Sequence, residues 1–130
     1  MRIVVDTNVI VSGIFFGGKP RTLLEKCFSG KFQIICTEEI FSEYLLTING
    51  LAGNSRQNII IEVKSILIEN LNFITNRYFE KYSRDPDDDK FINCAKSGNV
   101  KYVISGDKDL LILKNVEDIQ IIEVSYFLEK

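Results

Sequence analysis

The sequence predicts an α/β fold in which helices cover both faces of a central, mostly parallel sheet of four to five strands. Short apolar runs of strand length alternate with longer segments whose apolar residues recur at helical spacing. The chain has 130 residues, and no repeat, low-complexity tract or Pro/Ser-rich linker divides it. We therefore expect residues 1–130 to form a single doubly wound domain.

In the first half of the chain, glycines mark the expected helix ends and one threonine marks a helix start. The expected elements, in order, are a strand at 3–5, helices at 9–16 and 20–28, a strand at 32–36, and helices at 38–48 and 58–69. Both strands are continuous apolar runs, and Gly17-Gly18 separates the first two helices. Thr37 has the character of an N-cap for the third helix, which Asn49-Gly50 is expected to end.

The second half repeats the alternation. The expected elements are a strand at 72–75, a helix at 85–96, a strand at 102–105, a short helix within 106–113, a strand at 119–122 and a helical C-terminal tail. Asp85-Pro86 opens the helix at 85–96, because an N-cap aspartate followed by a first-turn proline is typical of a helix start. Ser97-Gly98-Asn99 closes that helix.

The composition excludes several classes of chemistry. The chain has no histidine, so Ser-His-Asp and Cys-His catalysis and histidine-bound zinc are excluded within it. Its net charge of −2 argues against nucleic-acid binding through a bulk positive field. The remaining chemistry must come from carboxylates, hydroxyls, amides, lysines or thiols.

The cysteines and the chain start indicate a cytoplasmic protein. Cys27, Cys36 and Cys94 form no CxxC pair or zinc pattern, so we interpret them as reduced core residues. Asp6 interrupts the first apolar run too early for a signal peptide, and no run approaches the ~20 residues that span a bilayer. We expect no membrane association.

Five aromatic residues can lie either in the core or at a protein interface: Phe15, Phe16, Tyr78, Phe79 and Tyr82. Core packing is the favoured interpretation for most of them, and a protein interface is the alternative.

Carboxylates fall where strands are expected to end. Asp6 follows the first strand, and Asp107 and Asp109 follow the fourth. Ligands of open parallel sheets bind beyond the carboxyl ends of strands at the switch point of strand order, so Asp6 and Asp107 meet if these strands are neighbours. Further acids can reach the same edge from two helices: Asp85, Asp87, Asp88 and Asp89 from one, and Glu38, Glu39 or Glu43 from the other.

Each acid also has a purely structural interpretation. Asp6 can cap the helix that follows it, and the aspartates at 85–88 suit a helix N-terminus. Asp107 and Asp109 are common turn formers. Helical geometry alone does not choose among the three glutamates, and spacing alone does not separate Asp88 from Asp89.

The acids are more informative together than singly. Several carboxylates at one sheet edge repel one another unless a cation offsets their charge. Oxygen ligands without histidine or cysteine favour Mg²⁺ or Mn²⁺ over zinc or copper. One or two such ions suit phosphodiester hydrolysis, because they can activate water and stabilise the leaving oxygen.

Three segments carry a family resemblance that covers essentially the whole chain. Residues 5–12 (VDTNVIVS), 85–95 (DPDDDKFINCA) and 102–111 (YVISGDKDLL) resemble the three motifs of PIN-domain proteins, in family order and at family spacing. The nearest subgroup is the bacterial and archaeal one of VapC-like toxin components of toxin–antitoxin systems. Rivals fit less well: a phosphoryl receiver needs a mid-chain aspartate, a dehalogenase-like phosphatase needs aspartate at Asn8, and a Rossmann domain needs a glycine-rich first turn.

The resemblance implies a three-layer α/β/α sandwich and a Mg²⁺- or Mn²⁺-dependent ribonuclease. Its catalytic acids correspond to Asp6, Glu43, Asp89 and Asp107, and its metal ligands to Asp6, Asp89, Asp107 and Asp109. Asn8 and Ser105 match polar positions that orient the acids or a metal-bound water. Gly106 stands where many relatives carry a larger residue.

The remaining expectations concern RNA and protein partners. Four cations are weak candidates for phosphate contacts, with a solubilising surface role as the favoured alternative: Lys19, Arg21, Lys90 and Lys108. By family resemblance, we expect an RNA substrate, a small antitoxin protein and a homodimer. The alternative is a catalytically weak PIN domain that binds nucleic acid or regulates a process through a protein partner.

Overall fold

The computed structural model describes residues 1–53 and 57–130, which form one six-stranded sheet in the order β3-β2-β1-β4-β6-β5. The strands are β1 (Arg2–Val5), β2 (Gln33–Cys36), β3 (Leu71–Phe73), β4 (Tyr102–Ile104), β5 (Asn115–Val116) and β6 (Ile119–Ile122). Neighbouring strands are parallel except for the antiparallel pair β5 and β6. The predicted mostly parallel sheet is confirmed.

The sheet has six strands rather than the four to five expected, and β5 is the strand that the sequence analysis missed. It comprises only Asn115 and Val116, which pair with Gln120 and Ile119. Two residues leave no periodicity to detect. The turn of this hairpin contains Glu117, whose φ of 54° lies in the left-handed region. The sequence pattern does not predict that conformation.

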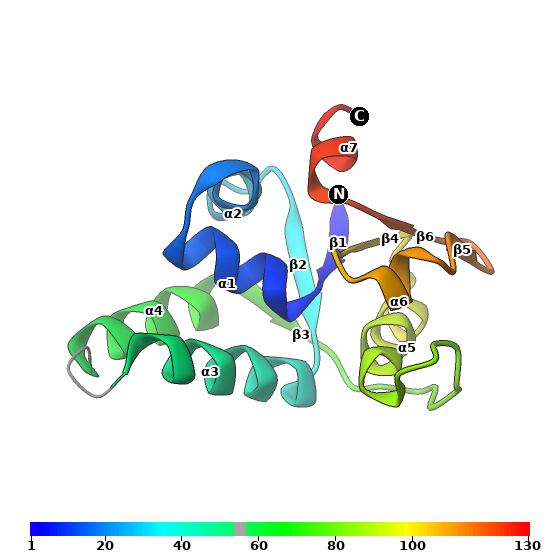
Figure 1. The fold of residues 1–130 in the computed structure, drawn as a ribbon, viewed down its shortest axis with the longest axis horizontal. Helices are drawn as coiled ribbons and strands as arrows, with labels where there is room; N and C mark the ends of the chain where they lie inside the picture. Colours follow the sequence, from blue (N-terminus) through cyan, green and yellow to red (C-terminus); the bar gives the residue numbers. More distant parts are fainter. Residues whose placement is uncertain (54–56) are drawn as a thin grey trace.

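Helices cover both faces of the sheet, which confirms the three-layer α/β/α arrangement (Figure 1). They are α1 (Thr7–Phe15), α2 (Gly18–Phe28), α3 (Glu38–Ala52), α4 (Gln57–Asn70), η2 (Pro86–Asp88), α5 (Asp89–Ser97), α6 (Lys108–Leu111) and α7 (Val124–Leu128). Helices α1 to α4 gather on one side of the sheet, and α5 packs against β1, β2, β4 and β6 from the other. Among the described residues, no helix is both long and apolar enough to cross a membrane.

One predicted helix end is wrong. Helix α3 does not stop at Asn49-Gly50 but continues to Ala52. Ile48 and Ala52 are both buried one turn apart, so the apolar stripe continues past the glycine. A glycine inside a helix costs only about 1 kcal/mol, which this burial offsets. The helix ends instead at Gly53, whose φ is 70°.

The core confirms the expected state of the cysteines and corrects the expectation for three aromatic residues. Cys27, Cys36 and Cys94 are free and buried, and burial raises the pKa of each thiol to about 12. Phe16, Tyr78 and Phe79, however, are 75%, 39% and 81% exposed, so core packing is the wrong interpretation for these three. Phe15 and Tyr82 do pack against the core. The three exposed residues lie outside the helices and strands, in the segments that follow α1 and β3.

Candidate functional site

The switch point of strand order lies between β1 and β4, and it brings Asp6 and Asp107 to one edge. β1 and β4 are parallel neighbours, and the Asp6 N–H donates to the Ile104 carbonyl over 2.9 Å. Ser105, fully buried after β4, donates its hydroxyl to Asp6 Oδ2 over 2.7 Å. The same hydroxyl oxygen accepts the Asp107 N–H over 3.0 Å. Ser105 therefore links the two strand-end acids.

Asp109 joins this edge through the short helix α6. Asp107 caps that helix, because its Oδ1 accepts the Asp109 N–H over 2.8 Å. The side chain of Asp109 is in turn paired with the Arg84 guanidinium, with Nη2 2.6 Å from Oδ1. Arg84 is a cation at the site that the sequence analysis did not identify, and no motif marks it.

Glu43 reaches the site from helix α3. Tyr44, fully buried, donates its hydroxyl to the Val5 carbonyl over 2.5 Å, which fixes α3 against the end of β1. On the neighbouring position, Glu43 Oε2 accepts the Thr7 hydroxyl, and Oε1 lies 2.6 Å from Lys90 Nζ. The glutamate at 43, rather than those at 38 and 39, contributes to the acidic site, since Glu43 raises the pKa of Asp6 electrostatically.

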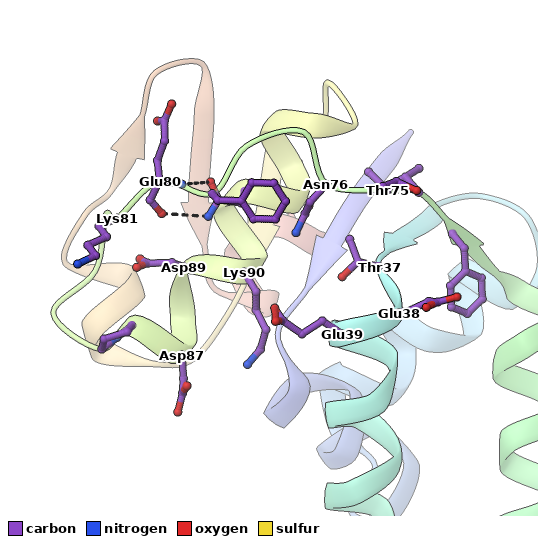
Figure 2. Close-up of a pocket in the computed structure, with 15 residues that line it drawn as sticks. Thr37, Glu38, Glu39, Thr75, Asn76, Glu80, Lys81, Asp87, Asp89 and Lys90 are labelled. Atoms are coloured by element: carbon purple, nitrogen blue, oxygen red, sulfur yellow. Dashed lines mark hydrogen bonds between the residues drawn. The ribbon is translucent and has the colours of Figure 1, made fainter.

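The structure distinguishes Asp88 from Asp89. Asp88 is 7% exposed at the end of η2, and its charge interacts with Asp107 and Asp6. Asp89 Oδ1 instead accepts the backbone N–H groups of Tyr82 and Ser83, over 3.0 and 2.8 Å. The carboxylate of Asp89 thus holds the loop before η2, and it lines a groove on that side (Figure 2).

Burial, together with the charges of neighbouring acids, shifts the pKa values of Asp6 and Asp88. Burial raises the pKa of Asp6, the hydrogen bond from Ser105 opposes that shift, and the charges of Asp107 and Glu43 add to it. Burial also raises the pKa of Asp88 to about 7, and four acids add to this effect: Asp107, Asp6, Asp85 and Asp109. Carboxylates held together against mutual repulsion are typical of a site that receives a cation.

The oxygen atoms present fit a hard divalent cation. Asp85, Asp88 and Asp109 each offer one carboxylate oxygen, and these three oxygens lie within 4.8 Å of one another. Oδ2 of Asp88 is buried and accepts no hydrogen bond from the described residues. An all-carboxylate donor set with such an unpaired oxygen suits Mg²⁺ or Mn²⁺. Asp85, one of the acids expected to reach this edge, also caps η2 as expected, because its Oδ1 accepts the Asp87 N–H over 3.0 Å.

The other predicted site residues lie in different environments. Asn8 lines a groove of about 430 Å³ beside Asp107, together with Lys19. Arg21 donates to the carbonyls of Gly13 and Ile14, both over 3.0 Å, and so caps helix α1. Two lysines are also placed by the structure: Lys90 is paired with Glu43, and Lys108 is exposed at the start of α6.

Comparison with known proteins identifies the fold family. A family model described as the PIN domain matches residues 2–109. No curated protein matches the sequence. Among solved structures, the chain is similar to VapBC2 from Rickettsia felis, crystallised with a DNA fragment from its promoter (TM-score 0.64, 13% identity, covering 93% of this chain and 97% of that one).

Two further solved structures share the fold. FitAcB from Neisseria gonorrhoeae aligns with a TM-score of 0.63 at 15% identity, covering 95% of this chain and 99% of that one. PAE2754 from Pyrobaculum aerophilum aligns with a TM-score of 0.63 at 13% identity, covering 99% of this chain and 88% of that one. All three alignments span nearly the whole described domain.

Proposed function

The chain belongs to the PIN-domain family, and we propose that it is a metal-dependent endoribonuclease whose acidic site uses Mg²⁺ or Mn²⁺. The observation that carries the proposal is the convergence of Asp6, Asp88 and Asp107 at the switch point between β1 and β4. A phosphodiester cannot approach such a cluster without a cation, because its own negative charge is repelled.

We assign cation binding to the acids that the structure brings together. Asp88 replaces Asp89 in this assignment, since Asp89 is engaged by the loop backbone while Asp88 Oδ2 is free of hydrogen bonds from the described residues. The ligand set is then Asp6, Asp88 and Asp107, with Asp85 and Asp109 directly or through water. When bound, a divalent cation supplies charge neutralisation, water activation and stabilisation of the leaving oxygen.

The other side chains position this set. Ser105 orients Asp6 Oδ2 and the backbone of Asp107 with a single hydroxyl. Glu43 is held at both oxygens by Thr7 and Lys90, so it is fixed beside Asp6. Each oxygen of a carboxylate has two lone pairs, so Glu43 can still accept a hydrogen bond from a water and draw off its proton.

A protein partner is part of the proposal. The similar structures VapBC2 and FitAcB and the family resemblance together support a role as the toxin of a toxin–antitoxin pair, with a small antitoxin protein as partner. We further propose a cytoplasmic homodimer. Co-expression with the product of a neighbouring reading frame, followed by size-exclusion chromatography, tests both the antitoxin partner and the homodimer.

The catalytic assignment is tested by cleavage of a mixed RNA in Mg²⁺ or Mn²⁺. We expect Asp6→Asn and Asp107→Asn to reduce the cleavage rate at least about 100-fold, since each removes a charge that the metal-assisted transition state needs. Asp118→Asn, an exposed acid outside the cluster, is the matched control and keeps full activity. Equal cleavage by all four proteins contradicts the proposal, and RNA binding without any cleavage favours a binding module.

A further inference from the structure

A groove of about 630 Å³ lies beside the acidic site, between the start of helix α3, helix α5 and the loop that joins β3 to η2 (Figure 2). Its lining includes Phe79 and Asn76 from the loop and Lys90 from α5. Lys90 is also the ion-pair partner of Glu43, with 2.6 Å between Nζ and Oε1. The groove therefore borders the acidic site at Lys90.

The loop that forms one wall is held in place by α5. Asn93 Oδ1 accepts the Glu80 N–H over 3.1 Å, and Asn93 Nδ2 donates to the Glu80 carbonyl over 3.0 Å. Asp89 fixes the next turn through the backbone N–H groups of Tyr82 and Ser83. Four hydrogen bonds from two buried side chains thus pre-organise the loop, which reduces the entropy lost when a ligand binds.

Phe79 projects from this fixed loop into solvent. Its side chain is 81% exposed although the residues on both sides of it are anchored or packed, and it lines the groove. Folding gains little from a ring in that position, because apolar stabilisation scales with the area removed from water. An exposed aromatic ring on an anchored loop beside a hydrolytic site is a stacking platform of the kind that binds unpaired bases.

The charges of the groove favour a base over a phosphate. Five carboxylates line it against two lysines: Glu38, Glu39, Glu80, Asp87 and Asp89 against Lys81 and Lys90. A phosphate is repelled by this lining, whereas a neutral base with amino groups can donate hydrogen bonds to it. The exposed cations Arg77 and Arg84 lie on the same loop, outside the groove, where a sugar-phosphate backbone can pass.

We propose that this groove binds one unpaired base of single-stranded RNA, stacked on Phe79, next to the phosphodiester that the acidic site cleaves. The inference rests on the proposed ribonuclease function and adds a site that selects the strand and the base. It explains why an acidic protein has an exposed aromatic ring on a pre-organised loop. Duplex RNA is excluded from the groove because its bases are stacked and paired.

The test is a position-resolved binding measurement on full-length protein carrying Asp6→Asn, so that the RNA stays intact. An unstructured, fluorescently labelled RNA of about 12 nucleotides is titrated by anisotropy, and then a series in which one base at a time is removed. We expect Phe79→Ala to weaken binding of the intact RNA about 5- to 100-fold, and Phe79→Tyr to restore it. We expect one abasic position to weaken binding to the same extent, and to have no further effect in Phe79→Ala.

Phe16→Ala is the matched control, because Phe16 is 75% exposed at the C-terminal end of α1, does not line the groove, and should change affinity less than about twofold. Unchanged affinity in Phe79→Ala, alongside metal-dependent cleavage by the wild type, overturns the base site and leaves the ribonuclease proposal intact. An equal loss at every abasic position in both proteins also overturns it. If the wild type neither binds nor cleaves RNA, both proposals fail. Loss of a bound protein partner with unchanged RNA affinity assigns the groove to that partner instead.

Discussion

The substitutions Asp88→Asn and Asp89→Asn are expected to have opposite effects on stability, although the two residues are adjacent. Burial and neighbouring acids raise the pKa of Asp88 from its ordinary value of 3.8 to about 7. A raised pKa means that the folded state binds this proton more tightly than the unfolded state. Asp88 therefore stabilises the fold most below about pH 4, and this contribution is lost as the pH rises through about 7.

The size of the effect follows from the shift. A change of about 3 pKa units corresponds to about 4 kcal/mol, which solvent at the open side of the site reduces to about 2 kcal/mol. At pH 8 and without metal, Asp88→Asn removes the repelled charge, so we expect it to raise the free energy of unfolding by about 2 kcal/mol. Asp89→Asn weakens two bonds from backbone N–H groups, so we expect a loss of about 1 kcal/mol.

The assay is urea denaturation in EDTA at about pH 4.5 and at pH 8, with RNA cleavage measured in parallel. Asp88→Asn should be more stable than the wild type only at the higher pH, and its cleavage rate should fall at least about 100-fold. Asp89→Asn should keep cleavage within about tenfold of the wild type. A variant Asp88→Asn that is no more stable than the wild type at pH 8, or a loss of cleavage in Asp89→Asn instead, contradicts the roles assigned to these two residues.

Three further predictions concern the frame of the site. Tyr44→Phe leaves the buried Val5 carbonyl without its donor, so chemical denaturation should show a loss of about 1–3 kcal/mol, and an unchanged midpoint contradicts this. Gly13→Ala places a Cβ 2.6 Å from Leu24 Cδ1 and 2.9 Å from the Pro20 carbonyl oxygen, so the α1–α2 contact should be destabilised by about 1–3 kcal/mol; a melting temperature equal to that of the wild type contradicts it. All three cysteine thiols are buried with pKa values of about 12, so a thiol reagent at pH 8 should label them only after unfolding, and rapid labelling of the native protein argues against the packing described.

The strand-end acids could be predicted because the end of a strand is recognised from neighbouring residues in the sequence. Val5 and Ile104 close apolar runs, and a polar residue follows each run directly. Parallel pairing of β1 and β4 then places Asp6 and Asp107 together, as expected. The edge on which these acids lie could thus be predicted from the apolar runs and their ends, whereas the strand order, including the pairing of β1 with β4, comes from the structure.

Local pattern alone could not separate Asp88 from Asp89. Consecutive residues at a helix start point about 100° apart, so the choice between Asp88 and Asp89 depends on how the turn sits in the fold. That orientation is set by a tertiary contact, in which the loop N–H groups of Tyr82 and Ser83 bind Asp89. Arg84 was not predicted to lie at the site because its partner, Asp109, is 25 residues away in sequence and only the fold brings the two together.

We propose that a divalent cation held by the strand-end acids makes this protein a ribonuclease. The most direct measurement is the initial rate of cleavage of an unstructured RNA as Mn²⁺ is titrated into protein stripped with EDTA, for the wild type and for Asp6→Asn. We expect no cleavage in EDTA, a rate that saturates with Mn²⁺ for the wild type, and a loss of at least about 100-fold for Asp6→Asn. Cleavage that persists in EDTA, or that is equal in the two proteins, contradicts a metal-dependent mechanism at these acids.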